Sequence, residues 1–322
     1  MSYSVLPGDL DQVVARWLQA QDGAARRELS GRMTEFYRKG QSSAHIDLAA
    51  YLTSRLPATY ATISSVLKEL AYVMPEFKPQ SLLDIGAGPG TASWAALNVW
   101  PELTNISMVE PDARFIDLAK LLATQSNILE LNAATFTRAK MNEVDVKADL
   151  VVAAYVFAEL GAKSASEMTL KLWSQTQHTL AIIEPGTPAG FARIKAARDV
   201  LINAGANIVG PCTHANTCPM SGDDWCHFVQ RLSRSREHMH AKGANAPFED
   251  ENFSWIAASR YPVKTLKARV LARPETSKHD IKFKLCTENG LYNSVIARRD
   301  KAAYKRYRKL AWGDAVDASP EN

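Results

Sequence analysis

The sequence predicts an α/β protein: a doubly wound parallel sheet, with an N-terminal helical segment before it and a small C-terminal β unit after it. Two observations lead to this fold class. Short apolar runs of strand length alternate with helix-length segments from residue 79 to residue 207, which is typical of a parallel sheet with helices on both faces. Beyond residue 207 the alternation stops, and a cysteine-containing stretch and a basic block follow.

The length of 322 residues allows about two domains. Hydrophobic residues make up 46% of the chain and charged residues 22%, which is ordinary for a globular protein and excludes a disordered chain. The apolar residues never run unbroken for about 18 positions, so we expect no membrane-spanning helix. The expected regions are an N-terminal helical region (1–78), a sheet domain (79–207), a cysteine-rich insertion with a return strand (208–259) and a basic β and helix region (260–322).

The expected elements follow from hydrophobic periodicity. In the N-terminal region, apolar residues recur at helical spacing over 10–18, 46–52 and 63–73. The strands expected in the sheet are 81–85, 105–109, 128–131, 148–155 and 179–183, with a return strand at 253–259. The helices expected between them cover 91–99, 111–124, 170–177 and 191–204. In the basic region we expect strands at 267–273, 281–286 and 291–298 and a helix at 301–310.

A glycine-rich loop follows the first predicted sheet strand. Glycines let the backbone approach a ligand closely, and the free N–H groups of the helix that follows attract polar or negative ligand atoms. A dinucleotide fingerprint would need glycine at position 91, where Thr91 stands. The pattern G-x-G-x-G, with Asp84 two residues before its first glycine, is instead the motif of S-adenosylmethionine (SAM) methyltransferases. It predicts a class I SAM-methyltransferase fold.

Glu110 strengthens this prediction because it lies at the end of the second predicted strand, 20 residues after the last loop glycine. A carboxylate in that place can accept hydrogen bonds from both hydroxyls of a ribose. The alternative is a surface glutamate beside a plain glycine-rich turn. The predicted SAM-binding residues are Asp84, Gly86, Gly88, Gly90 and Glu110.

No catalytic residue can be assigned from the sequence. The Asn/Asp-Pro-Pro-aromatic motif of amino methylation is absent after the fourth strand, and no cysteine nucleophile for cytosine C5 methylation lies in this half of the chain. Tyr155, Glu159 and Glu184 could border the pocket, but each is as easily a packing or capping residue. Whether the chain is an enzyme is therefore left open.

All four cysteines lie after the predicted sheet domain, too few for a disulfide scaffold. They are Cys212, Cys218, Cys226 and Cys286. The stretch 211–228 is too polar to form its own core, so a metal could organise it. Four thiolates suit tetrahedral zinc or an iron–sulfur cluster, and the long gaps, C-x5-C-x7-C-x59-C, fit a bulkier cluster better than zinc. His214 and His227 are alternative ligands, for which four thiols leave no vacancy.

Positive charge is concentrated near the C-terminus. Residues 260–309 hold 15 Lys and Arg against 4 Asp and Glu, whereas the whole chain has a net charge of +4. Such a block favours a polyanion partner over a merely solvated surface. We expect RNA phosphates to contact Lys305, Arg306, Arg308 and Lys309, and tyrosines to stack on unpaired bases. The tyrosines of this block are Tyr261, Tyr292, Tyr304 and Tyr307.

The chain resembles the small-ribosomal-subunit methyltransferase-like assembly factors, a family that includes methyltransferase-like protein 17 and bacterial relatives. The resemblance covers residues 50–314, and its cysteine block is highly specific. The matching segments are Arg55-Leu-Pro-Ala-Thr-Tyr60, Leu83-Asp-Ile-Gly-Ala-Gly-Pro-Gly-Thr91, Pro211-Cys212, Cys218-Pro219, Asp224-Trp-Cys-His-Phe228, Glu249-Asp-Glu251, Phe253-Ser-Trp255, Leu285-Cys286 and Trp312-Gly-Asp314.

This resemblance implies a SAM-methyltransferase fold, a 4Fe-4S cluster on the four cysteines and association with small-subunit rRNA during assembly. We therefore expect a ribosome assembly factor. The alternatives are an active SAM-dependent rRNA methyltransferase and an iron- or redox-sensing regulator of translation. We expect SAM and the cluster (alternatively zinc) as cofactors, rRNA and ribosomal proteins as partners, no membrane contact and a monomer. With no leader recognised in the sequence, we expect a bacterial-type cytoplasmic protein rather than one of the mitochondrial matrix.

Overall fold

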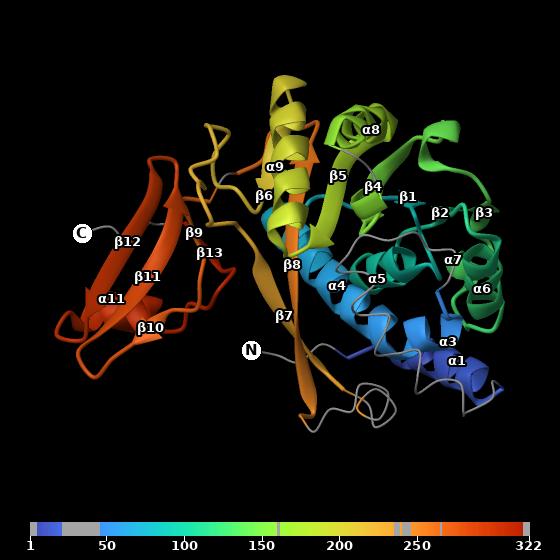
Figure 1. Ribbon diagram of the computed structural model, residues 1–322, viewed down its shortest axis with the longest axis horizontal. Helices are drawn as coiled ribbons and strands as arrows, with labels where there is room; N and C mark the ends of the chain where they lie inside the picture. Colours follow the sequence, from blue (N-terminus) through green and yellow to red (C-terminus); the bar gives the residue numbers. More distant parts are fainter. Residues whose placement is uncertain are drawn as a thin grey trace.

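The computed structural model describes residues 5–20, 46–159, 162–234, 239, 246–264 and 266–317. A large sheet covered by helices forms most of the molecule, and a smaller sheet stands beside it (Figure 1). The α/β fold class predicted from the sequence is confirmed.

The main sheet has eight strands in the order β3-β2-β1-β4-β5-β8-β6, with β7 paired to β8. The strands β1 to β5 pair in parallel, whereas β8 runs antiparallel to β5, β6 and β7. The strands are β1 (Ser81–Ile85), β2 (Asn105–Val109), β3 (Thr135–Thr137), β4 (Ala148–Ala154), β5 (Thr176–Pro185), β6 (Asn207–Gly210), β7 (Phe228–Ser233) and β8 (Phe248–Ser259).

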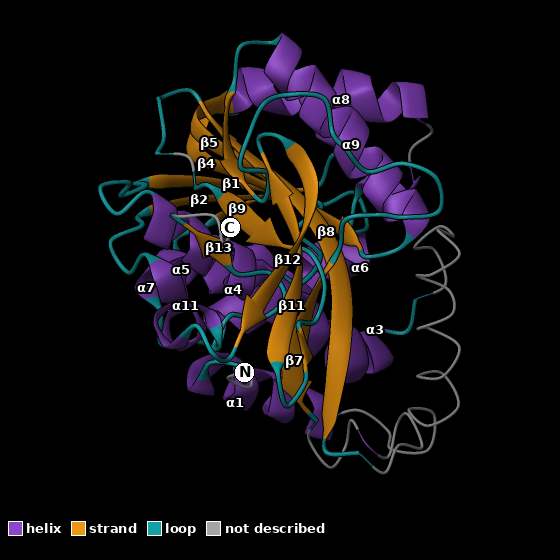
Figure 2. Cartoon of the chain, turned by 90° about the vertical axis from the view of Figure 1, so that its left-hand side faces the viewer, coloured by secondary structure: helices purple, strands orange, loops and turns teal. Residues whose placement is uncertain are grey.

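Helices cover both faces of the main sheet (Figure 2). On one face lie α4 (Leu56–Val73), α5 (Thr91–Val99) and α6 (Ala113–Thr124), and on the other α8 (Ala162–Gln175) and α9 (Pro188–Asn203). The central strands are buried from both sides, which is why β4 reads as an almost continuous apolar run. Shorter elements are α1 (Gly8–Gln19), α3 (Leu48–Ala50), α7 (Leu129–Asn132), the π-helical turn η2 (Tyr51–Arg55) and the 3-10 turns η3 (Met141–Glu143) and η4 (Phe157–Glu159).

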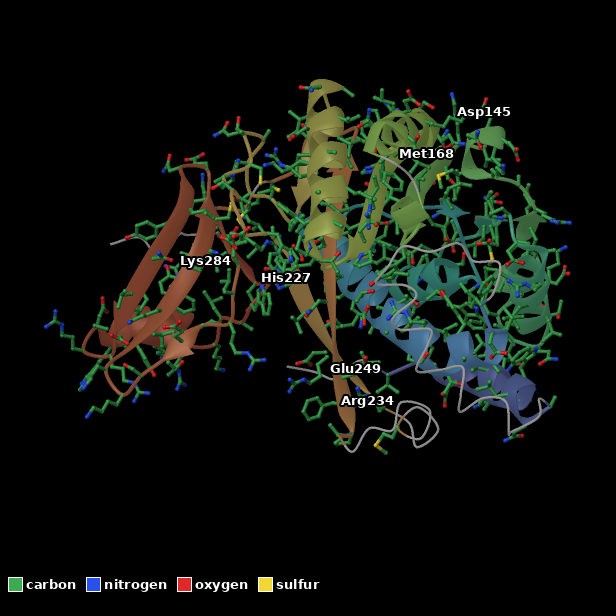
Figure 3. All side chains as sticks on the ribbon, viewed as in Figure 1. Asp145, Met168, His227, Arg234, Glu249 and Lys284 are labelled. Atoms are coloured by element: carbon green, nitrogen blue, oxygen red, sulfur yellow. The ribbon has the colours of Figure 1, made fainter. Side chains whose placement is uncertain are left out.

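The C-terminal unit is a five-stranded antiparallel sheet with one helix packed on it. Its strands are β9 (Ala268–Val270), β10 (Glu275–Thr276), β11 (Asp280–Thr287), β12 (Gly290–Ala297) and β13 (Ala315–Val316), and its helix is α11 (Lys301–Tyr307). The unit has its own small apolar core, which contains Phe283 and Leu285. Figure 3 shows Lys284 of this unit and His227, just before β7, on facing sides of the boundary between the two sheets.

Two sequence-based expectations about elements need correction. Residues 128–131, expected as the third strand, lie at the helical turn α7, where the Asn132 amide donates to the carbonyl of Ile128 at 3.0 Å. The third strand is β3, an edge strand whose half-exposed Thr-Phe-Thr sequence gives no apolar run. The helix expected at 170–177 ends at Gln175, and β5 begins at the next residue.

Two strands of the main sheet were not anticipated, nor were the two-residue strands β10 and β13 of the C-terminal unit. β6 is four residues long and β7 has the mixed sequence Phe-Val-Gln-Arg-Leu-Ser, so neither has the apolar run of a central strand. Both pair with β8, whose N-terminal half extends beyond the main sheet as a hairpin with β7. The ion pair between Arg234 and Glu249 ties the far end of this hairpin (Figure 3).

Candidate functional site

The glycine loop connects β1 to α5 at the carboxyl end of the sheet. Gly86, Gly88 and Gly90 all have positive φ, between 54° and 84°, so this loop needs glycine for its backbone conformation. The N–H groups of Gly86 and Ala87 both donate to the carbonyl of Val109, at 2.8 and 3.0 Å. The loop is therefore fixed to the end of β2, next to Glu110.

Two buried acids hold this loop in place. Asp84 accepts hydrogen bonds from the backbone N–H and the hydroxyl of Ser93, at 3.0 and 2.8 Å. Burial raises the pKa of Asp84 to about 7, although these hydrogen bonds lower it. Glu110 accepts from the N–H of Gly88 at 2.9 Å and from the N–H of Asp112 at 3.0 Å. Asp84 and Glu110 thus organise the loop that was predicted to bind SAM.

A pocket of about 640 Å³ opens at the ends of β1 and β2. Its walls are Gly86, Val109 and Pro111, the loop 139–142 and residues of α8 that include Met168, which Figure 3 shows below the α8 ribbon. We call it the glycine-loop pocket. Its volume lies within the range of small-molecule sites, roughly 300–1,000 Å³. It is large enough for the nucleoside part of a SAM-sized ligand.

The other side of the loop is covered by the N-terminal region. A Cβ atom at Gly88 would lie 3.7 Å from the Tyr51 hydroxyl oxygen and 4.0 Å from Phe115. The rings of Tyr51 and Phe115 pack edge to face, with centroids 5.0 Å apart. A Cβ at Gly86 would come within 2.0 Å of a Val156 methyl, so the protein itself requires glycine there. The turn η2, which carries Tyr51, is a π-helix, a feature often found at functional sites.

The residues considered as catalysts serve as structural partners. Tyr155 has a positive φ of 62°, and its buried hydroxyl lies 3.0 Å from that of Thr62. Burial raises the pKa of Tyr155. Glu184 is fully buried, pairs with Arg193 at 2.8 Å and accepts from the N–H of Phe157. The side chain of Glu159 lies outside the described residues.

Sequence reasoning missed a buried ion pair near Tyr155. The guanidinium of Arg55 lies 3.1 Å from Glu251 of β8 and 5.8 Å from the centre of the Tyr155 ring. Burial alone would lower the pKa of Arg55, but the carboxylate of Glu251 raises it. The two residues are 196 positions apart, so no local pattern could pair them.

The four cysteines converge on one cavity between α9, β8 and the C-terminal unit. Its lining contains Cys212, Cys218, Cys226 and Cys286, together with apolar side chains such as Phe191, Ile194, Met220 and Leu271. We call it the cysteine cavity. Its volume is about 30 Å³, the share of one water in the liquid. The structure thus places three thiols from one loop and a fourth from β11 around one cavity.

Two arginines and a histidine surround these thiols. The Nε of Arg198 donates to the sulfur of Cys212 at 3.3 Å, and the sulfur of Cys286 lies 3.5 Å from His214 Nε2. Arg269 lines the cavity as well. Burial raises the pKa of Cys286 to about 12, and it raises that of Cys226 well above its usual value. Without a ligand the thiols of Cys226 and Cys286 are therefore protonated at neutral pH.

The donor set was tested for its fit to a metal. Among the residues that the structure describes, no three His, Cys, Asp or Glu side chains form a group that could hold one metal ion. A tetrahedral zinc with bonds of about 2.3 Å needs thiolates roughly 3.8 Å apart. A four-iron cluster spreads its thiolates over four metal ions, so they lie farther apart. Four thiols line one apolar cavity of about 30 Å³ beside the guanidinium groups of Arg198 and Arg269, and as placed they do not form the ligand set of one metal ion.

The basic helix α11 lies on the outer C-terminal unit. Lys305, Arg306, Arg308 and Lys309 are all exposed there, at or just after the end of the helix. Of the four tyrosines, Tyr307 is only 8% exposed and packs in the core of the unit, so the expectation that it stacks on RNA bases is wrong. Tyr304 is half-buried beneath Arg298, whereas Tyr261 and Tyr292 are exposed.

Strand order and glycine loop together define the class of protein. A sheet ordered 3-2-1-4-5 and continued by one antiparallel strand, with a G-x-G-x-G loop after its first strand, is the class I SAM-methyltransferase fold. The family follows from the sequence match. Residues 45–317 match the family described as "Mitochondrial small ribosomal subunit Rsm22", and the chain belongs to this family.

Two curated relatives illustrate the family. The human "Ribosome assembly protein METTL17, mitochondrial" is 27% identical over 290 residues, which are 83% of this chain and 61% of that protein. The Schizosaccharomyces pombe "Rsm22-cox11 tandem protein 2, mitochondrial" is 26% identical over 319 residues, 82% of this chain and 42% of that protein. This chain thus spans about half of the length of these relatives.

Solved structures of similar fold are more distant. Magnesium protoporphyrin IX methyltransferase from Synechocystis with bound SAM is 14% identical, with a TM-score of 0.43 over 75% of this chain and 99% of that one. A SAM-dependent methyltransferase from Agrobacterium tumefaciens is 10% identical, with a TM-score of 0.41 over 64% of this chain and 63% of that one.

The relatives correct one expectation from the sequence. All three curated relatives are named as mitochondrial proteins, which contradicts the prediction of a bacterial-type cytoplasmic protein. As for membranes, none of the helices in the described residues has the length and hydropathy needed to span one.

Proposed function

We propose that this chain is an assembly factor of the small ribosomal subunit, of mitochondrial type, that binds rRNA through its basic C-terminal unit. The observation that carries this proposal is the cluster of exposed cations Lys305, Arg306, Arg308 and Lys309 on α11 and directly after it. No ion pair occupies any of the four among the described residues, so all are available for phosphates. Family membership and the names of the relatives support the ribosomal setting.

The test is to neutralise these four cations together with glutamine. Each phosphate contact contributes roughly −0.7 to −0.9 to the slope of log K against log salt. The fourfold variant should therefore flatten the salt dependence of rRNA binding by up to about 3 and leave immature small subunits on sedimentation. A matched control replaces Lys78, Lys120, Arg138 and Lys147, which are exposed on the methyltransferase-like part. If both fourfold variants co-sediment as well as wild type does, the proposed rRNA interface is wrong.

We also propose that Cys212, Cys218, Cys226 and Cys286 hold a 4Fe-4S cluster. The cluster would offer redox chemistry, or a purely structural bond between the loop after β6 and β11. The Arg198 N–H that points to Cys212 and the nearby Arg269 would stabilise thiolates that burial otherwise disfavours. Because the cavity volume is about 30 Å³, the thiol side chains must turn outward to receive a cluster.

Iron and sulfide analysis of anaerobically purified protein tests the cluster. Each cysteine-to-serine variant should lose iron, and Cys286→Ser should lose as much as a variant of the loop cysteines. The control is Asn293→Ala, a change at an exposed residue of the neighbouring strand β12, which should keep its iron. Stoichiometric zinc without iron would contradict the cluster, and full iron in Cys286→Ser would contradict the assignment of that ligand.

SAM binding is the next part of the proposal. The nucleoside would enter the glycine-loop pocket, while Asp84 and Glu110 keep the loop in shape. The methionine end would need space beside Gly88, which Tyr51 and Phe115 cover. Binding of the whole ligand therefore requires that η2 move.

Active methyl transfer to rRNA is the second candidate function. The glycine loop favours it, whereas Tyr155 and Glu184 are committed to internal hydrogen bonds and ion pairs. The assembly role is therefore the better supported of the two. If a labelled methyl group were transferred from SAM to immature small subunits, methyl transfer would become the better supported function. A regulator that senses iron or redox state would instead change its rRNA affinity when the cluster is oxidised.

A further inference from the structure

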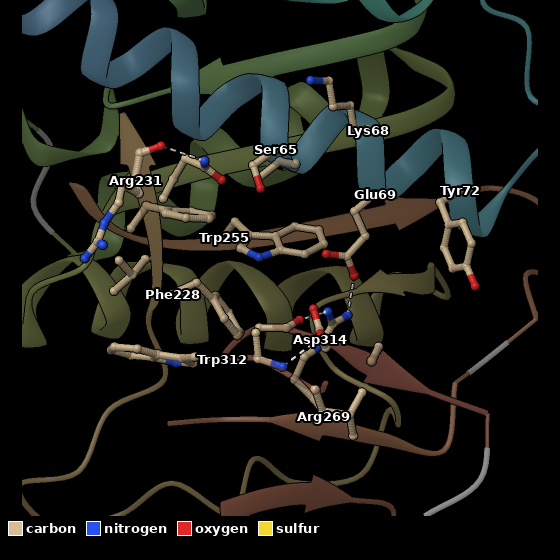
Figure 4. A pocket seen from close by; sticks show the side chains of 18 of the residues that line it. Ser65, Lys68, Glu69, Tyr72, Phe228, Arg231, Trp255, Arg269, Trp312 and Asp314 are labelled. Atoms are coloured by element: carbon tan, nitrogen blue, oxygen red, sulfur yellow. Dashed lines mark hydrogen bonds and ion pairs between the residues drawn. The ribbon is translucent and has the colours of Figure 1, made fainter. Parts of the chain in front are cut away.

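A large pocket lies apart from the glycine loop and shares Trp255 and Arg269 as walls with the cysteine cavity. It has a volume of about 540 Å³ and is bounded by α4, the β7–β8 hairpin and the C-terminal unit (Figure 4). We call it the junction pocket. Its walls include Lys68, Glu69 and Tyr72 of α4, Trp255 of β8, and Trp312 and Asp314 of the C-terminal unit.

Rigid aromatic side chains form much of the junction pocket. Trp312 is half-exposed, and its Nε1 donates to the carbonyl of His227 at 3.0 Å, which fixes the plane of the indole. Trp255 and Phe228, 2% and 4% exposed, line its inner wall. Tyr72 is 76% exposed at the opposite side of the view in Figure 4. Flat aromatic faces suit a planar ligand, and the indole of Trp312 is held in one orientation.

Fixed carboxylates give the junction pocket its polar character. Glu69 is held by Arg269, which also donates to the carbonyls of Pro211 at 2.8 Å and of Gly313 at 2.7 Å. Asp314 accepts from the N–H of Ala311 at 2.8 Å. Carboxylates only accept hydrogen bonds when ionised, so they select a ligand that donates N–H groups.

Cations surround the same pocket. Lys68, one residue before Glu69, forms no ion pair within the described part of the chain, and Figure 4 shows its amine on the α4 side. On the other side, the exposed Arg308 and Lys309 lead through Leu310 and Ala311 directly to Trp312. A chain of phosphates bound along α11 would therefore run past the mouth of this pocket.

We propose that the junction pocket binds one unpaired, amino-bearing nucleotide of an RNA strand. The inference rests on the rRNA binding proposed above and gives it a sequence preference. The base stacks on Trp312, its exocyclic amino group donates to the carboxylates of Glu69 and Asp314, and Lys68 contacts a phosphate. Adenine, cytosine and guanine carry such an amino group, whereas uracil has none: its one base donor, N3–H, is flanked by two carbonyl oxygens that the carboxylates repel.

The test measures the affinity of the full chain for short single-stranded RNA made only of A, only of C or only of U. Wild type should bind the A and C strands more tightly than the U strand. Trp312→Leu and Tyr72→Ala each remove one aromatic face of the pocket, and both should weaken binding to the A and C strands. The variant that removes the stacking residue should weaken it by roughly 5- to 150-fold. Glu69→Gln should remove the preference over U, because glutamine also offers an amide donor while it still accepts from Arg269.

Controls and outcomes separate this inference from the proposed function. Lys120→Ala and Leu170→Ala, both exposed on the methyltransferase-like part, should leave all three affinities unchanged. If Tyr72→Ala and Glu69→Gln bind like these controls, the junction pocket is not a nucleotide site, and the α11 interface stands. If wild type binds none of the RNAs, both proposals are overturned. Should Trp312→Leu fail to fold, the RNA affinities of Tyr72→Ala and Glu69→Gln still decide the test.

A protein segment is the competing occupant. In immature small subunits, a photoreactive base should cross-link to the peptide that contains Trp312. Cross-links from that peptide only to a ribosomal protein would overturn the nucleotide assignment.

Discussion

The glycine loop and the boundary between the two sheets both bury charge, but they satisfy it in different ways. At the glycine loop, Asp84 and Glu110 accept from N–H groups that lie at most 22 residues away. At the boundary, Arg198 and Arg269 donate to carbonyls and to a carboxylate up to 200 residues away. The short acidic side chains thus fix a local loop, whereas the long arginine side chains join segments that are distant in the sequence. The first arrangement can be recognised in a sequence and the second cannot.

Removing Arg269 should disrupt the contacts between the two sheets and cause the largest loss of stability. Arg269→Leu leaves Glu69 and the carbonyls of Pro211 and Gly313 without their donor, so we expect the free energy of unfolding to fall by about 3–5 kcal/mol. Denaturant unfolding monitored by circular dichroism measures this. Arg299→Leu, an exposed arginine of the same basic block, should change it by about 0.5 kcal/mol or less. Equal effects of the two substitutions would mean that Arg269 does not hold the boundary.

At the glycine loop, the contribution of Asp84 to the free energy of unfolding should depend on pH. The pKa of Asp84 is about 7 in the folded chain against 3.8 in its usual environment, so the folded chain keeps a proton that the unfolded chain releases. This group therefore lowers stability as the pH rises from about 4 to about 7, by up to roughly 4 kcal/mol. In Asp84→Asn, which still accepts from Ser93, the fall should be absent over that range. If the free energy of unfolding depends on pH in the same way in wild type and variant, Asp84 is not a buried carboxyl without a counter-ion.

The smallest change in stability is expected at Gly88. A Cβ atom has ordinary contact distances there, and the cost comes from its φ of 54°, about 1–2 kcal/mol. Gly88→Asp should nevertheless abolish SAM binding in calorimetry, because its carboxylate would occupy the place of the ligand's own. The control Gly205→Asp has a comparable φ of 77° and open space around its Cβ. If both variants bind SAM like wild type, the ligand does not use this loop.

The same contrast explains what the sequence could predict. The fold class, the strands β1, β2, β4, β5 and β8 and the convergence of the cysteines depend on apolar runs, a loop motif and a family resemblance. The strands β3, β6 and β7 were missed or misplaced because they are short or lie at an edge, where partial exposure weakens the apolar pattern. The junction pocket was missed because Arg269 reads as one more surface cation in a basic block, whereas it is 3% exposed and paired with Glu69.

The position of β8 has a consequence for how the chain is made. In the finished sheet β5 lies between β4 and β8, but about 60 residues separate the end of β5 from the start of β8. At a synthesis rate of about 5–20 residues per second, β5 has an unpaired, strongly apolar edge for roughly 3–12 s. An open apolar edge of this kind pairs readily with other chains. Until the chain has been made as far as residue 259, β5 therefore remains an open edge of the sheet.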